Sequence, residues 1–161
     1  MSRMTAVTIF ILGACLLPAF RAQQQDETRA SGDPWSAQQL IQPRALADWL
    51  ASGRPKPLIL YVGFPVLYRG AHIPRAQLAG PCSKPEGIAL LRSTAAAFPK
   101  DRDVILYCGC CPFQRCPNIR PAFEELRKQG FSRIHVLEIP TNFHADWVTK
   151  NFPVEKGAPD S

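Results

Sequence analysis

The residues with the most evident chemistry are four cysteines between positions 108 and 116. They lie in the segment VILYCGCCPFQRCPN (residues 104–118), which begins with an apolar run that predicts a buried strand. A thiolate is a strong nucleophile and a soft metal ligand, and two thiols can also close a disulfide. The spacing therefore leaves open a nucleophile with helper groups, a metal site and a disulfide pair.

The place of these cysteines in the predicted fold favours a nucleophile. Cys108 ends the apolar run, and a helix with Asn118 as its N-cap is expected to begin only after Cys116. The unpaired N–H groups and the dipole of a helix N-terminus favour an anion, which lowers the pKa of a thiol placed there. We therefore expect Cys108 to be held as a thiolate, with Arg115 or Arg120 adding positive charge for an anionic substrate.

The rest of the chain predicts alternating strands and helices. Continuous apolar runs predict buried strands at 57–62, 103–108 and 133–139. Amphipathic or capped segments predict helices at 36–41, 43–53, 86–98, 118–130 and 142–150, and a loop containing YRGAHIPRA at 68–76. This order indicates an α/β fold with a mainly parallel central sheet flanked by helices on both faces, which binds ligands beyond the carboxyl ends of its strands.

Six segments, taken in order, resemble a rhodanese-like domain, a sulfurtransferase fold. They are WSAQQLIQ, PLILYVG, YRGAHIPRA, VILYC, AFEELRKQGF and IHVLEI with the later tryptophan, and they fall between residues 35 and 150. The resemblance implies that Cys108 attacks a sulfane sulfur, becomes a persulfide and passes the outer sulfur to a thiol acceptor. It also implies that loop amides from Gly109 onward stabilise the thiolate and that His72 is mainly structural.

The sequence also departs from the common sulfurtransferase pattern. Tyr61, Val62 and Gly63 replace the usual aspartate-valine-arginine, IPTN at 139–142 replaces a glycine pair, and the loop after Cys108 is longer. The donor is thus expected to be a small sulfur-bearing anion that need not be thiosulfate. The predicted site consists of the nucleophile Cys108 and substrate contacts from Gly109, Cys110, Cys111 and Arg115. Cys116 is the first candidate for a resolving thiol, and Cys110 and Cys111 are further candidates for a resolving or persulfide-accepting thiol.

Three other functions stay open. CGCC satisfies C-x-x-C with Cys108 and Cys111 at its ends, which would suit a thiol–disulfide oxidoreductase. The four clustered cysteines could ligate zinc or copper(I), although C-x-C-C-x4-C is not a standard zinc-ribbon spacing, and we expect no metal and no cofactor. The third alternative is a non-catalytic rhodanese-like module. A phosphatase of the C-x5-R type is excluded, because the required positions hold Gln114, Cys116 and Pro117.

The first 22 residues predict an export signal. An early Arg3, an apolar stretch from Thr5 to Phe20 and a polar glutamine run have that layout, and the apolar stretch is short for a membrane span. LGAC, ending at Cys15, also resembles a lipoprotein box, so attachment to a membrane through a lipidated Cys15 is an alternative. We expect a periplasmic or otherwise exported protein with a flexible leader at 23–34 and one domain at 35–155.

Charge and cysteine count add two constraints. The chain has 19 basic and 13 acidic residues, but the basic ones are scattered, which argues against nucleic-acid binding. Disulfides persist in exported compartments, and five cysteines remain after Cys15: Cys82, Cys108, Cys110, Cys111 and Cys116. Since five is odd, at least one thiol has to stay free, pair between molecules or carry a function.

Overall fold

The computed structural model describes residues 32–157. The predicted export signal, including Cys15, and the predicted leader as far as residue 31 lie outside these residues. Among the helices of the described part, none is long and apolar enough to cross a membrane.

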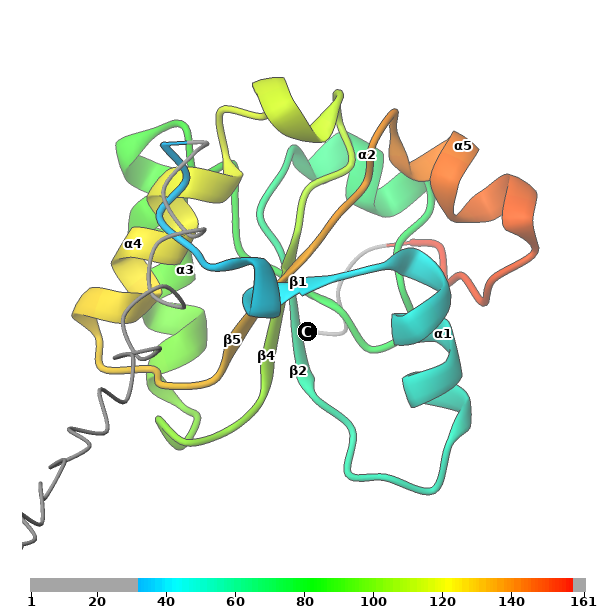
Figure 1. Ribbon diagram of the computed structural model, residues 1–161. Coiled ribbons are helices and arrows are strands. Elements are labelled where there is room, and N and C mark those ends of the chain that lie inside the picture. Colours follow the sequence, from blue (N-terminus) through cyan, green and yellow to red (C-terminus); the bar gives the residue numbers. More distant parts are fainter. Residues whose placement is uncertain (1–31, 158–161) are drawn as a thin grey trace, which may run out of the picture.

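A five-stranded parallel sheet forms the centre of the domain (Figure 1). Its order is β1-β5-β4-β2-β3, and each neighbouring pair is parallel. The strands are β1 (Leu40–Ile41), β2 (Leu58–Tyr61), β3 (Gln77–Leu78), β4 (Val104–Tyr107) and β5 (Ile134–Leu137). The prediction of an α/β fold with a mainly parallel sheet is confirmed.

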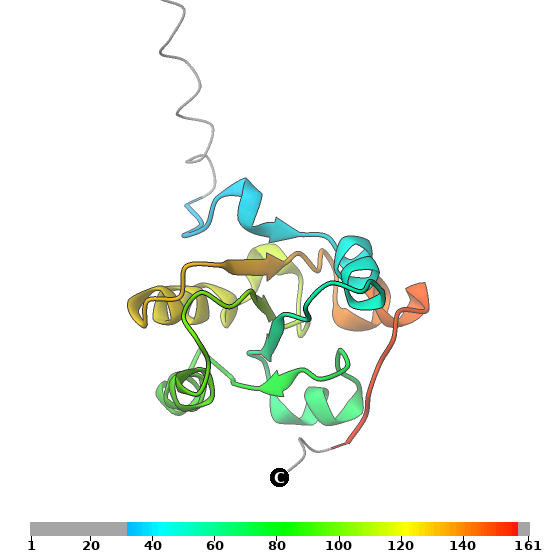
Figure 2. The same ribbon diagram turned by 90° about the horizontal axis from the view of Figure 1, so that it is seen from below.

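Helices cover both faces of this sheet (Figures 1 and 2). Helices α3 (Pro85–Ala96) and α4 (Ile119–Lys128) pack side by side on one face. Helices α1 (Pro43–Ala51), α2 (Pro65–Gly70) and α5 (Phe143–Asp146) lie on the other. Three short 3₁₀ turns complete the domain: η1 (Ala37–Gln39), η2 (Phe113–Arg115) and η3 (Val148–Lys150).

The central strands are buried on both faces, which explains their continuous apolar sequences. Successive side chains of a strand point to opposite faces, so Leu106 and Cys108 join the core beneath α3 and α4. Ile105 and Tyr107 join the second core, beneath α1, α2 and α5. The alternation therefore directs the Cys108 side chain toward the face that carries α4.

The structure differs from the prediction at the short elements. The segment expected to be a loop at 68–76 begins inside α2, which Pro65 starts at its first position. Only residues 37–39 of the expected 36–41 helix are helical, and the next two form β1. Two-residue edge strands and a six-residue helix are too short for hydrophobic periodicity to identify.

Candidate active site

The cysteine loop joins the carboxyl end of β4 to the amino end of α4 and contains η2. Gly109 adopts a positive φ of 71°, and its carbonyl oxygen accepts a hydrogen bond of 3.0 Å from the Phe143 backbone N–H. A Cβ at position 109 would lie 2.7 Å from the Cβ of Phe143. Glycine is thus required here both by the positive φ and by the lack of space for a Cβ, and it lets the loop turn tightly against the start of α5.

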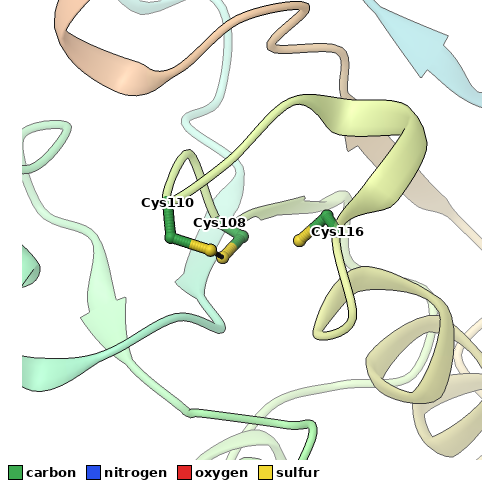
Figure 3. A group of neighbouring side chains, drawn as sticks. All are labelled: Cys108, Cys110 and Cys116. Carbon is green, nitrogen blue, oxygen red and sulfur yellow. Dashed lines mark hydrogen bonds between the residues drawn. The ribbon is translucent and has the colours of Figure 1, made fainter.

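Four cysteines of this loop, Cys108, Cys110, Cys111 and Cys116, form what we call the thiol cluster. The Sγ of Cys110 lies 3.2 Å from the Sγ of Cys108 and 3.2 Å from that of Cys111. The Sγ atoms of Cys108, Cys110 and Cys116 all lie within 4.8 Å of one another (Figure 3). Cys108 and Cys116 are buried, whereas Cys110 and Cys111 are half-buried. All five cysteines among the described residues are free thiols.

Asn118 connects the cluster to the rest of the fold. It is the predicted N-cap residue of α4, but its side chain does not cap the helix. Its Oδ1 accepts a hydrogen bond of 2.8 Å from the Ser83 backbone N–H, and its Nδ2 donates to the Sγ atoms of Cys108 (3.4 Å) and Cys110 (3.8 Å). Because Ser83 needs the oxygen, the amide can present only its NH₂ group to the sulfurs.

The negative charge of the resting cluster is centred on Cys110. Hydrogen bonds from Cys108 and then Cys116 lower the pKa of Cys110 to about 2, aided by Cys111 and Asn118 and opposed by partial burial. The pKa of Cys108 is raised, because its thiol donates to Cys110 and Cys116 and is buried. Burial, followed by the contact with Cys110, raises the pKa of Cys111 to about 12. These contacts favour a single thiolate, at Cys110, among neutral thiols.

The sequence predicts a Cys108 thiolate held by a helix N-terminus, whereas the hydrogen bonds within the cluster favour a thiolate on Cys110. The Cys108 side chain follows β4 as predicted, but only 2% of it is exposed. The backbone N–H groups at the start of α4, those of Asn118 and Ile119, act on Cys116, which lies two residues before the N-cap Asn118. The hydrogen bond with Cys108 lowers the pKa of Cys116, but contact with Cys110 and burial raise it, and the net shift is upward.

A cavity of about 340 Å³ opens beside the cluster. One wall of the cavity consists of Cys108, Gly109 and Cys110. The other walls consist of Tyr61, Leu67, Ala71, Asn142, Phe143, His144 and Val148. Gly109 and Cys110 thus lie where substrate contacts were predicted. Cys111 and Arg115 do not belong to this lining among the described residues, and Arg115 is exposed on η2. Arg120 is also engaged elsewhere, since its Nε donates to Asp33 at 2.7 Å.

Gly63 and Tyr61 also shape the site, although the sequence suggested them only as departures from a family pattern. A Cβ at position 63 would lie 2.8 Å from the Cys108 Sγ and 2.6 Å from the Tyr61 hydroxyl oxygen. Burial, followed by the nearness of Cys108, raises the pKa of Tyr61. The rhodanese-like pattern has arginine at position 63. A side chain there would collide with the Cys108 sulfur and the Tyr61 phenol, which explains the glycine in this chain.

Two predicted accessory residues lie apart from the cluster. His72 is buried, its ring stacks on Tyr68 at 3.8 Å between centroids, and its Nδ1 contacts the Tyr68 carbonyl at 2.8 Å. These contacts agree with a mainly structural histidine. Cys82 is buried and donates to the Ala79 carbonyl at 3.1 Å, and burial raises its pKa to about 12. It is therefore a core thiol.

The cluster also provides a donor set for a soft metal ion. A tetrahedral Zn²⁺ with Zn–S bonds of about 2.3 Å holds its sulfurs about 3.8 Å apart. The mutual separations of Cys108, Cys110 and Cys116, up to 4.8 Å, are compatible with such an ion or with copper(I) after small shifts.

Comparison with known proteins identifies the fold type of this domain. No protein-family model and no curated protein matches the sequence. The rhodanese-like domain of a protein from Anabaena sp. aligns at 25% identity over 76% of this chain and 89% of that domain, with a TM-score of 0.54. A crystal structure of the same Anabaena protein aligns at 24% identity over 72% of this chain and 82% of its own, with a TM-score of 0.57.

A thiosulfate sulfurtransferase from Pseudomonas aeruginosa is similar at 24% identity, with a TM-score of 0.55 over 73% of this chain and 19% of that one. The parallel sheet, its helices on both faces and these similarities define a domain of the rhodanese-like fold. The resemblance inferred from the six sequence segments is thus confirmed at the level of the fold.

Proposed function

We propose that this chain is a sulfurtransferase that carries a sulfane sulfur as a persulfide on Cys108. The supporting observation is the contact of 3.2 Å between the Cys108 and Cys110 sulfurs, at the wall of a cavity beyond the carboxyl end of β4. That end of a parallel sheet is where α/β folds bind their ligands. The contact pairs a thiol with a neighbour that can take its proton, because the transfer removes the Cys108 hydrogen bond that lowers the pKa of Cys110.

The first step requires Cys108 to lose its proton as it attacks. In the hydrogen bond to Cys110 the proton already lies between the two sulfurs. The Cys108 sulfur attacks the outer sulfur of a donor persulfide, R–S–SH, and its proton passes to Cys110. The donor S–S bond breaks and R–S⁻ leaves with the bonding electrons, then takes the proton from Cys110. Cys108 becomes a persulfide and the Cys110 thiolate is restored.

The walls of the cavity limit the class of donor. Its lining includes Leu67, Phe143 and Val148, and His144 is its one basic residue within the described chain. Neither of the arginines that the sequence offered for anion binding lines it. A doubly charged anion such as thiosulfate would lose its hydration there with little compensation. The proposed donors are therefore organic persulfides and polysulfides, and the acceptor is a thiol.

The test measures all sulfur that the protein takes from a donor. Reduced protein is mixed with glutathione persulfide, and both protein-bound sulfane sulfur and released sulfide are counted. We expect one equivalent in total for the native chain and none for Cys108→Ser. Cys82→Ser removes a buried thiol outside the cluster and serves as the matched control. Failure of the native chain to take up sulfur would leave a binding module instead of an enzyme.

Export is proposed on the sequence of residues 1–22 alone. Cell fractionation, with the mass of the mature N-terminus, tests it: an exported chain without a lipid anchor loses the apolar segment from Thr5 to Phe20. A lipid-anchored form would begin at Cys15 and leave the membrane fraction in a Cys15→Ser variant. Retention of the intact N-terminus in the cytoplasm would contradict export.

A further inference from the structure

Cys108 and Cys110 are arranged as a pair that can close a disulfide. One residue separates them, and the positive φ of Gly109 turns the chain so that the two sulfurs lie 3.2 Å apart. A disulfide bond is about 2.05 Å long, so closure requires the sulfurs to approach by little more than about 1 Å.

The two thiols differ in exposure in a way that separates their roles. Cys108 is 2% exposed, whereas Cys110 is half-buried and lines the cavity beside it. Since both thiols line this cavity, hydrosulfide released from Cys108 can leave through it. The sequence suggested Cys116 as the resolving thiol, but Cys116 is buried and does not line this cavity among the described residues.

We propose that Cys110 resolves the persulfide on Cys108, so that each cycle reduces one sulfane sulfur to hydrosulfide and leaves a Cys108–Cys110 disulfide. This inference rests on the proposed function and adds a reductase activity to it. It also assigns the attack on the persulfide to Cys110, where the sequence left an external acceptor and three thiols of the loop, Cys110, Cys111 and Cys116, as candidates.

The step is balanced within the site. The Cys110 thiolate attacks the Cys108 Sγ, and the bond from that Sγ to the outer sulfur breaks. The outer sulfur leaves with the bonding electron pair and the proton it already carries, as HS⁻. The two cysteine sulfurs together lose two electrons, and the outer sulfur gains them. An external dithiol, such as a thioredoxin-like protein, then reduces the disulfide by exchange and restores both thiols.

The experiment follows one turnover without external thiol. Reduced, desalted protein is mixed anaerobically with one equivalent of glutathione persulfide, and released sulfide and intact mass are measured. For the native chain we expect one equivalent of sulfide and the loss of two hydrogen atoms, with peptide mapping that joins Cys108 to Cys110. Cys110→Ser lacks the sulfur that takes the Cys108 proton, so we expect slower uptake that still ends in the gain of one sulfur atom, with a large loss of sulfide release.

Cys82→Ser is the matched control, because Cys82 is a buried free thiol that lies outside the cluster and does not line its cavity among the described residues. It should behave as the native chain does. A native chain that keeps the added sulfur and releases no sulfide would overturn the inference but leave the proposed function standing. Unchanged mass in both the native chain and Cys110→Ser would instead contradict the proposed function.

Two further outcomes would overturn the inference. Sulfide release by Cys110→Ser with a mapped Cys108–Cys116 disulfide would assign the resolving role to Cys116. A glutathione adduct on Cys110→Ser would mean that Cys108 attacks the inner sulfur of the donor, so that no persulfide forms on the protein.

Discussion

Asn118 donates a hydrogen bond of 3.4 Å from its Nδ2 to the Sγ of Cys108. The same amide is anchored by the Ser83 backbone N–H, so its orientation toward the sulfurs does not depend on them. A residue at the start of α4 thus positions the thiol cluster through its side chain, while the backbone of the helix acts on Cys116.

The first prediction concerns this amide. Asn118→Asp keeps an oxygen for Ser83 but replaces the NH₂ donor with a negative charge beside the cluster, which opposes the thiolate. We expect at least a tenfold slower uptake of sulfane sulfur. Asn118→Ala should also remove the part-buried hydrogen bond from the Ser83 N–H and lower the free energy of unfolding by about 0.5–1.5 kcal/mol. Stopped-flow kinetics and urea denaturation measure the two effects, and native uptake by Asn118→Asp would exclude a positioning role.

The second prediction concerns pH. Since the pKa of Cys110 is lowered to about 2, its thiolate should persist as the pH falls. Its alkylation by iodoacetamide, followed by peptide mass spectrometry, should change little between about pH 5 and 8. An ordinary thiol with a pKa of about 8.5 slows about tenfold per pH unit over that range. Cys82, with a pKa raised to about 12 and a buried side chain, is the internal control and should not react in the folded protein. A tenfold loss per unit at Cys110 would contradict the location of the charge.

The third prediction concerns the space beside Cys108. Gly63→Ala would place a methyl group 2.8 Å from the Cys108 Sγ and 2.6 Å from the Tyr61 hydroxyl oxygen. Both neighbours are buried, so relief requires the site to shift. We expect destabilisation by about 1–3 kcal/mol and slower sulfur uptake. Gly53→Ala is the matched control, because nothing lies within 4 Å of the point where its added methyl group would stand, and its effect should stay within about 0.5 kcal/mol. Equal stability of the two variants would argue against the close packing described for the site.

The fourth prediction concerns the ion pair between α3 and α4. Arg92 bonds both carboxylate oxygens of the buried Glu125, at 2.8 and 3.1 Å, and this hydrogen bonding lowers the pKa of Glu125. Because the pKa of Glu125 is lower in the folded chain, its carboxylate stabilises the fold at pH values above the ordinary glutamate pKa of about 4.3. This stabilisation is lost as the pH falls through the pKa of the folded state. Glu125→Gln should thus be less stable than the native chain at neutral pH, and the difference should shrink in acid. Urea denaturation at several pH values measures it, and a difference that does not vary with pH would refute the linkage.

Much of the fold was predictable from the sequence, because its longer elements carry strong local signals. The runs that form β2, β4 and β5 are apolar because both faces of these strands are covered, and Pro43 and Asn118 mark helix starts. The short edge strands and α2 lack such signals, because their residues are placed by pairing and packing with distant parts of the chain.

The site was predictable only in part. The loop and its cysteines follow from the sequence, but the location of the charge depends on distances between sulfurs that spacing does not specify. Gly109 turns the loop so that Cys110, and not the helix terminus, faces Cys108. The outward direction of Arg115 and the packing of Cys108 against Gly63 likewise depend on the folded loop.

The proposed chemistry depends most directly on which cysteine carries the transferred sulfur. The decisive measurement is peptide mass spectrometry of the Cys110→Ser variant after reaction with glutathione persulfide, with free thiols alkylated before digestion. The account predicts one added sulfur on Cys108 and none on Cys111 or Cys116. Added sulfur on Cys111 or Cys116 with an unmodified Cys108, or no added sulfur on any cysteine even after prolonged reaction, would contradict it.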